Sequence, residues 1–264
     1  MTKRSSFANI FPILVIVVCY VVSYLIWQYY LGDPDNFVDE HREKPKVGNI
    51  AGVMYKGGFM VPIILTQLLM VIVFTIERML TITRARGTGN AANFVRKVQF
   101  HLSSNDLDAA ERECDKQRGS VANVIKSGLK KYREMAVNTQ LTHEQKVLAI
   151  QKEIEEATSL ELPMLQRNLP FIATIAPLGT LTGLIGTVFG MIRAFSAMGQ
   201  SGAADSVALS IGISEALVNT ATGITTSALA IIAYSYFSTR IDTLTYLIDE
   251  AGYSITNTFS AQHN

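Results

Sequence analysis

The chain has 264 residues, of which 48% are hydrophobic and 17% charged, and its formal net charge is +1. A charge balance this close to zero gives no reason to expect nucleic-acid binding, which depends on a basic surface. Two cysteines and four scattered histidines offer no zinc-binding spacing, and the sequence has neither a phosphate-binding loop nor a nucleophile elbow. We therefore expect a protein that is not an enzyme and holds no cofactor.

The apolar residues gather in four long stretches. A helix needs about 20 apolar residues to cross a hydrocarbon core of roughly 30 Å, and each stretch approaches or exceeds that length. The alternative is that they are buried helices of a large soluble protein. We predict an all-α integral membrane protein with four transmembrane helices, drawn from residues 5–32, 57–76, 168–192 and 206–239.

The first stretch follows Lys3 and Arg4 and could be mistaken for a signal peptide. Its apolar part is too long for one, and no small-x-small cleavage site follows it. Trp27, Tyr29 and Tyr30 close it with aromatic side chains, which are typical of the membrane interface. Residues 1–56 are therefore predicted to form an N-terminal membrane helix and a loop that connects it to the second span.

Basic residues near the ends of the spans predict the orientation of the chain. Lys3 and Arg4 favour a cytoplasmic N-terminus, and Arg84 and Arg86 follow the second span, residues 57–83. The helical domain at 84–167 and a C-terminal helix or tail at 241–264 are then cytoplasmic as well. Arg193, at the outer end of the third span, opposes this scheme.

The cytoplasmic domain is predicted to contain three helices. Residues 103–119 start with Ser and Asn caps and end at a glycine, and a second helix covers 120–136. Thr142 and Gln145 form a capping-box pattern that opens the third helix.

Three prolines lead from this third helix into the third span. Pro163, Pro170 and Pro177 recur every seven residues, so their bends would fall on nearly one face of a continuous helix. We expect that helix to curve in one direction.

The third and fourth spans, residues 168–240, carry the pattern expected of a pore. Small residues on one stripe let membrane helices approach closely. The stripe consists of Gly179, Gly183, Gly186 and Gly190. Thr180 and Thr187 lie beside it, and their hydroxyls either face a polar path or bond back to the preceding turn.

A polar stripe also follows the fourth span. Glu215, Asn219, Thr222 and Thr226 share one face, whereas Thr220 lies on another. A charged group at mid-membrane costs about 2.5–3.5 kcal/mol on insertion scales, so such residues face a bundle interior or a hydrated path. Glu215 is therefore either part of a proton or ion path or a structural acid bonded to a neighbouring helix.

Four segments carry a resemblance to a known family. TIAPL at 174–178, GLIGTVFGMIRAF at 183–195, GISEALVNTATGI at 212–224 and ERML at 77–80 resemble motifs of the ExbB/TolQ/MotA proton-channel family, most of all its ExbB branch. The resemblance makes Thr187 and Thr220 the pore threonines and Glu215 the acid of the second motif. It matches Glu77 and Arg78 to the interfacial pair that closes the first core helix.

The resemblance also implies an assembly and a function. It implies a homopentamer in the bacterial inner membrane, in contact with membrane lipids. The five subunits would enclose a dimer of ExbD-like single-span helices. Protons, as the coupling ion, would drive work on a TonB-like protein for outer-membrane transport. A TolQ-, MotA- or gliding-type stator and a non-conducting scaffold remain alternatives. The helix at 7–31 is additional to the three-span ExbB core. MotA proteins have four membrane spans, as predicted for this chain. They lack an acid of the ExbB type, however, so Glu215 argues against MotA.

Overall fold

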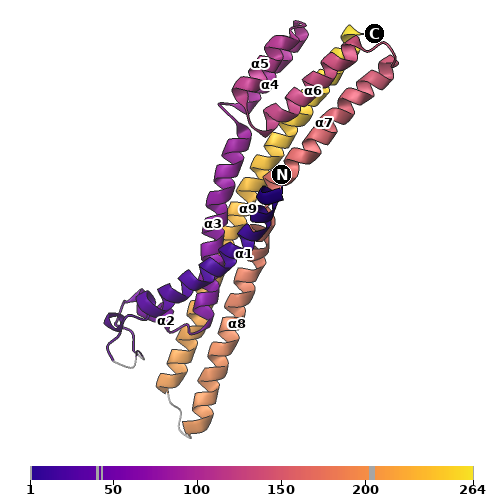
Figure 1. Ribbon diagram of the computed structural model, residues 1–264. Helices are drawn as coiled ribbons and strands as arrows, with labels where there is room; N and C mark the ends of the chain where they lie inside the picture. The colour runs from indigo at the N-terminus through magenta and orange to yellow at the C-terminus, as the bar shows by residue number, and fades with distance from the viewer. Residues whose placement is uncertain (1, 40–41, 43, 202–205, 264) are drawn as a thin grey trace. The chain divides into compact units, whose positions relative to one another are not determined.

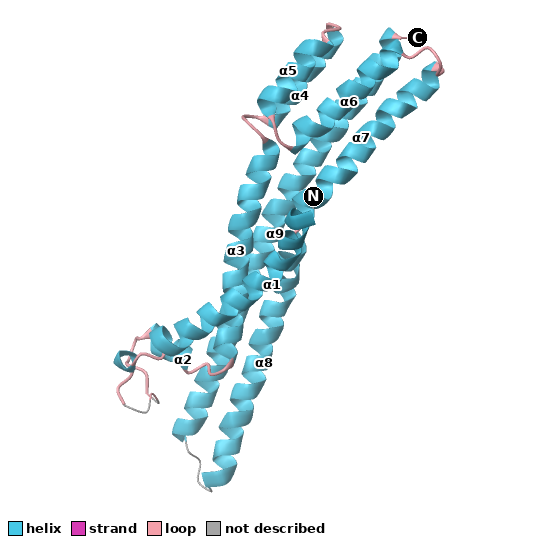
Figure 2. Cartoon of the chain, in the orientation of Figure 1, coloured by secondary structure: helices cyan, strands magenta, loops and turns pink. Residues whose placement is uncertain are grey.

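The computed structural model describes residues 2–39, 42, 44–201 and 206–263, without the side chains of residues 2–9, 197, 200, 201 and 206–208. Lys3 and Arg4, which support the predicted orientation, therefore have no described side chains. Within the described ranges the chain folds into helices joined by loops, and it contains no strand beyond one isolated bridge between Phe37 and Pro45 (Figures 1 and 2). It forms two compact units, residues 1–76 with 168–235 and residues 77–167 with 236–264.

The first unit contains the apolar helices. Helix α1 (Thr2–Leu25) continues into a π-helical segment, Ile26–Leu31. A short α2 (Ile50–Tyr55) precedes the first part of α3 (Met60–Arg86). The long helices α8 (Leu169–Ser201) and the first part of α9 (Ser206–Gln262) complete the unit.

Four of the described helical stretches are long and apolar enough to cross a membrane, as the sequence predicts. They are 10–31, 60–103, 143–196 and 209–262, and each contains a strongly apolar window. Many of their large apolar side chains are exposed within the single chain. Such exposure is expected of surfaces that face lipid or partner helices.

The loop between α1 and α3 is held by aromatic and amide side chains. Trp27 stacks on Tyr55 with ring centroids 4.9 Å apart. Asn36 Nδ2 donates to the carbonyl of Tyr30 at 2.8 Å, and Asn36 Oδ1 accepts from Asn49 Nδ2 at 2.9 Å. Trp27 of the expected aromatic belt thus packs on the loop, whereas Tyr29 and Tyr30 are exposed.

The second unit is a bundle of amphipathic helices. It contains α4 (Ala91–Ser103), α5 (Leu107–Gln117), α6 (Ser120–Val137) and α7 (His143–Gln166). The capping box of Thr142 and Gln145 is confirmed, but α5 is capped by Asp106 rather than by Ser or Asn. Helix α4 was not predicted, although Asn90 caps it and a strong amphipathic pattern follows.

The three prolines do not bend one continuous helix, which corrects the sequence prediction. Helix α7 contains Pro163 and ends at Gln166, and α8 contains Pro177. Pro170 is the second residue of α8, where its missing N–H would have had no intrahelical partner in any case. The middle proline therefore marks the start of a helix.

Helix α9 continues without a break through the fourth span to Gln262. Its last part is amphipathic, and Ile248, Ile255 and Phe259 are buried in the second unit. Phe259 packs edge-on against Tyr132 of α6 at a centroid distance of 4.9 Å. These contacts keep the region after residue 240 helical, because they bury an apolar stripe.

Candidate functional site

Helices α8 and α9 pack closely along facing glycines (Figure 1). The α8 stripe is fully buried and comprises Gly179, Gly183, Gly186 and Gly190. A Cβ on Gly183 would lie 3.0 Å from the carbonyl oxygen of Asn219, and one on Gly223 of α9 would lie 2.5 Å from the carbonyl oxygen of Gly179. Side chains beside this contact are therefore held within hydrogen-bonding reach of the opposite helix.

Thr187 and Thr220 meet across this glycine contact, and their hydroxyls form a hydrogen bond with each other. Thr187 Oγ1 also lies 3.1 Å from the carbonyl oxygen of Gly183, and Thr220 Oγ1 lies 3.2 Å from that of Ala216. Each hydroxyl has one proton to donate, so one threonine donates to the other while the second donates to a carbonyl. The direction of this pair can reverse without moving either helix.

The other predicted polar residues mostly bond within their own helix. Thr222 donates to the carbonyl of Val218 at 2.8 Å, and Thr226 donates to that of Thr222 at 2.9 Å. This is back-bonding to the preceding turn, which was considered from the sequence for Thr180 and Thr187 but not for these two residues. Thr180, on α8, is half-buried. Thr222 and Thr226 therefore do not extend the Thr187–Thr220 contact into a continuous polar line.

Asn219 connects the fourth span to the chain segment that enters α3. Its Nδ2 donates to the carbonyl of Gly57 at 2.9 Å, and the residue is buried. Its Oδ1 has no hydrogen-bond partner among the described residues. A buried, unsatisfied carbonyl oxygen is costly, so it is a position where an incoming donor would be stabilised.

Glu215 forms an ion pair with Arg193 of α8. Arg193 Nη1 donates to Glu215 Oε1 at 2.6 Å, with the Glu215 side chain 9% exposed and that of Arg193 49%. The guanidinium also lies 5.5 Å from the centre of the Phe59 ring, which it faces. A Cβ on Gly58 would lie 2.5 Å from Glu215 Oε1. Only glycine allows this close approach, and its φ of +72° requires glycine as well.

These contacts correct the expected depth of Glu215. Gly58 lies just before Met60, the first residue of α3, so Glu215 is level with the start of that span rather than halfway along it. The reason is that α9 begins at Ser206, more than two turns before Glu215. Its carboxyl group has a counter-charge and is not an isolated mid-span acid.

Glu77 and Arg78, the predicted interfacial pair, form an ion pair in which Arg78 is buried and Glu77 is partly exposed. Arg78 is 1% exposed, and its Nε and Nη2 donate to the two carboxylate oxygens of Glu77 at 2.7 and 2.5 Å. Its Nη1 donates to the carbonyl of Leu165 at 2.8 Å. Leu165 lies in the last turn of α7, where carbonyls lack intrahelical partners. The pair therefore caps α7.

Sequence reasoning missed Arg193 and Gly58 as parts of the site. Arg193 had a usable signal, because it and Glu215 lie about equally far from the connection at 202–205. In an antiparallel hairpin, residues equally distant from the turn face each other. Gly58 carried no comparable signal, since its contact with Glu215 joins segments far apart in the chain.

Comparison with known proteins extends the resemblance carried by these motifs. The family described as "MotA/TolQ/ExbB proton channel family" matches residues 116–250, just over half of the chain. The match covers α6, α7, α8 and most of α9, and so includes the Thr187–Thr220 and Arg193–Glu215 contacts. The chain belongs to this family. Helix α1 lies outside the matched residues.

Relatives named TolQ and relatives named ExbB are both similar to the chain. The Tol-Pal system protein TolQ of Pseudomonas aeruginosa is 28% identical over 182 residues, covering 63% of this chain and 79% of TolQ. The biopolymer transport protein ExbB of Neisseria meningitidis is 28% identical over 201 residues, covering 74% of this chain and 90% of ExbB. The putative ExbB-like protein 3 of Synechocystis is 38% identical over 86 residues, covering 32% of this chain and 41% of that relative.

The family and the four apolar helices together define the class of protein. The chain is a multi-pass membrane protein of a bacterial proton-channel family whose members act in membrane complexes. Relatives of both the TolQ and the ExbB type are similar to it, so family membership alone does not choose between them.

Proposed function

We propose that this chain is an inner-membrane proton-channel subunit that acts with an ExbD-like single-span partner. In this proposal, proton flow does mechanical work on a TonB-like protein for active transport across the outer membrane. The hydroxyl contact between Thr187 and Thr220, within the residues that match the family, carries the proposal.

The chemistry of the two hydroxyls fits proton transfer only with a partner. Within the single chain, each hydroxyl is bonded to the other or to a helix carbonyl. Both threonines are half-buried in the single chain, so neither residue is fully enclosed by it. A carboxylate on a partner helix is a stronger acceptor than a carbonyl and would compete for these protons. Proton movement would then depend on the partner's carboxylate.

The exposed apolar faces of the same helices fit an oligomer. Leu181, Leu184 and Val188 of α8 and Leu217 and Ile224 of α9 are exposed in the single chain. A pentamer around a dimer of partner helices would place some of these residues against neighbouring subunits and others against lipid. Native mass spectrometry in mild detergent should show five copies, whereas a stable monomer would contradict the proposed assembly.

The decisive experiment replaces each threonine by valine, which keeps the shape and removes the hydroxyl. We expect Thr187→Val and Thr220→Val to co-purify with the partner and to abolish growth that depends on active nutrient uptake. Thr225→Val is the matched control, because Thr225 is exposed on α9 and its hydroxyl donates to the carbonyl of Ala221 in its own helix at 2.8 Å. This control should grow normally.

The same experiment separates the alternatives. Normal growth of both valine variants would favour a non-conducting scaffold, for which the back-bonded Thr222 and Thr226 are the supporting observation. Loss of envelope integrity with intact nutrient uptake would favour a TolQ-type role. Loss of swimming or gliding alone would favour a motor stator.

A further inference from the structure

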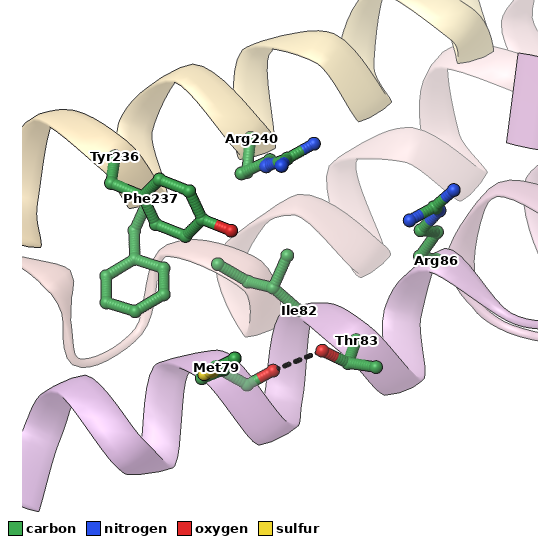
Figure 3. Close-up of a pocket in the computed structure, with 7 residues that line it drawn as sticks. All are labelled: Met79, Ile82, Thr83, Arg86, Tyr236, Phe237 and Arg240. Carbon is green, nitrogen blue, oxygen red and sulfur yellow. Dashed lines mark hydrogen bonds between the residues drawn. The ribbon is translucent and has the colours of Figure 1, made fainter. Parts of the chain in front are cut away.

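A groove lies between α3 and α9 where the apolar runs of both helices end. It has a volume of about 110 Å³ and is lined by Met79, Ile82, Thr83, Arg86, Tyr236, Phe237 and Arg240. A second hollow of about 280 Å³ shares Ile82, Arg86 and Arg240 with it. The two hollows thus meet at the same pair of arginines. In Figure 3, Ile82 lies beneath Arg240, and Met79 and Phe237 lie on the side of the groove away from Arg86.

The groove carries positive charge that the described part of the chain does not neutralise. Arg86 and Arg240 are both exposed, and no described carboxylate forms an ion pair with either guanidinium. The Arg240 guanidinium lies 5.2 Å from the centre of the Tyr236 ring, over its face. This cation–π contact restricts where the charge can lie. Two guanidinium groups on adjacent helices therefore remain available to one anion.

The rest of the groove is apolar. Phe237 is 2% exposed and Ile82 is also buried, so they form its floor, while Met79 is 58% exposed at its edge. The hydroxyl of Thr83 donates to the carbonyl of Met79 at 2.6 Å, which leaves its oxygen free only to accept. A ligand that uses the whole groove needs an anionic group and an adjoining hydrocarbon part.

We propose that this groove binds the headgroup of an anionic phospholipid. The guanidinium groups of Arg86 and Arg240 donate to the phosphodiester oxygens, for which the planar, paired donors of arginine are suited. The acyl chains leave the groove past Met79, whose side chain is exposed at its edge. Basic pockets between membrane helices are suited to such headgroups, because charge and apolar surface meet at the same depth. A free phosphate would use only the arginines. The proposal is independent of proton conduction.

The test measures lipid binding to the purified full-length chain in a neutral detergent. Phosphatidylglycerol and phosphatidylcholine are added in turn, and bound lipid is counted by native mass spectrometry over a concentration series. We expect phosphatidylglycerol to bind more tightly than phosphatidylcholine. Arg86→Gln and Arg240→Gln should each weaken phosphatidylglycerol binding about fivefold. Arg86→Lys and Arg240→Lys should lose less, because they keep the charge.

Arg84→Gln is the matched control. Arg84 is exposed and lies two residues from Arg86 on the same helix, but it does not line either hollow. Its loss should leave the affinity for phosphatidylglycerol unchanged. An equal loss in Arg84→Gln would overturn the proposal by showing only general surface attraction. Equal binding of the two lipids would also overturn it. So would displacement of phosphatidylglycerol by inorganic phosphate at constant ionic strength, because the ligand would then be the free anion.

Discussion

Arg193 and Glu215 join α8 to α9 through a hydrogen bond of 2.6 Å between Nη1 and Oε1. The carboxyl group is buried and the guanidinium is half exposed, so the buried acid on α9 receives its counter-charge from a partly exposed side chain on α8. Arg193, which opposes the orientation predicted from basic residues, is therefore paired within the chain.

Breaking this ion pair should destabilise the hairpin. Arg193→Gln leaves the buried carboxylate without its partner, and we expect a loss of about 1–2 kcal/mol. That is less than the roughly 3–5 kcal/mol of a fully buried pair, because water reaches Arg193. Thermal unfolding in detergent measures the effect. Glu215→Gln should be milder than Glu215→Ala, because the amide fills the site and still accepts a hydrogen bond.

The charge-swapped double variant, Arg193→Glu with Glu215→Arg, separates the effect of the ion pair from the effect of changing each side chain alone. It should recover part of the stability that each single swap loses, because opposite charges again face each other across the hairpin. A double variant no better than the sum of the two single swaps would show that the ion pair does not couple the two helices.

The glycine contact predicts different effects on stability for two Gly→Ala changes within helices, one at the contact and one away from it. Gly223→Ala places a Cβ 2.8 Å from Cα of Gly183, so the helices must separate, at a cost of about 1–3 kcal/mol. Gly199→Ala meets nothing within 4 Å and should be neutral or slightly stabilising, because alanine favours the helix. Thermal unfolding of the two variants checks this, and equal melting temperatures would contradict the packing.

Cys114 should be unreactive in the folded protein. It is 2% exposed, and burial, followed by the nearby Asp115 charge, raises the pKa of its thiol from 9.0 to about 12. In a Cys19→Ala background, a maleimide at pH 8 should label the unfolded chain and spare the folded one. Rapid labelling of the folded chain would contradict the burial of this thiol.

The same pKa shift predicts a pH dependence of stability. The unfolded chain releases the thiol proton near pH 9 and the folded chain near pH 12, so the folded state binds more protons between these values. The stabilising contribution is complete below pH 9 and falls by up to about 1.4 kcal/mol per pH unit above it. Unfolding of the Cys114→Ala variant should lack this part of the alkaline destabilisation.

The proposed orientation can be tested with exposed cysteines. Val47 lies in the loop before α2 and Thr139 in the loop between α6 and α7, and both are exposed. An impermeant thiol reagent added outside intact inner-membrane vesicles of native orientation should label Val47→Cys and spare Thr139→Cys. The native Cys19 and Cys114 are buried and should give little background. Reversed labelling would contradict cytoplasmic termini.

Local patterns in the sequence determined much of the fold. Four apolar stretches predicted the spans, because a bilayer requires long apolar helices whatever their neighbours are. The Thr142–Gln145 capping box was visible because its two partners are three residues apart. Helix α4 was missed although its cap and amphipathic pattern were present, and the repeated proline spacing hid the start of α8 at Leu169.

Only the tertiary structure decided how the polar side chains are used. The sequence placed Thr187 and Thr220 on two helices, but the glycine contact sets the register that joins their hydroxyls. Periodicity put Glu215, Thr222 and Thr226 on one face, yet the acid bonds to Arg193 and the threonines bond to their own helix. Helical periodicity specifies which face a residue occupies, whereas its partner depends on the depth and register of the neighbouring helix. Those are set by packing between segments far apart in the chain.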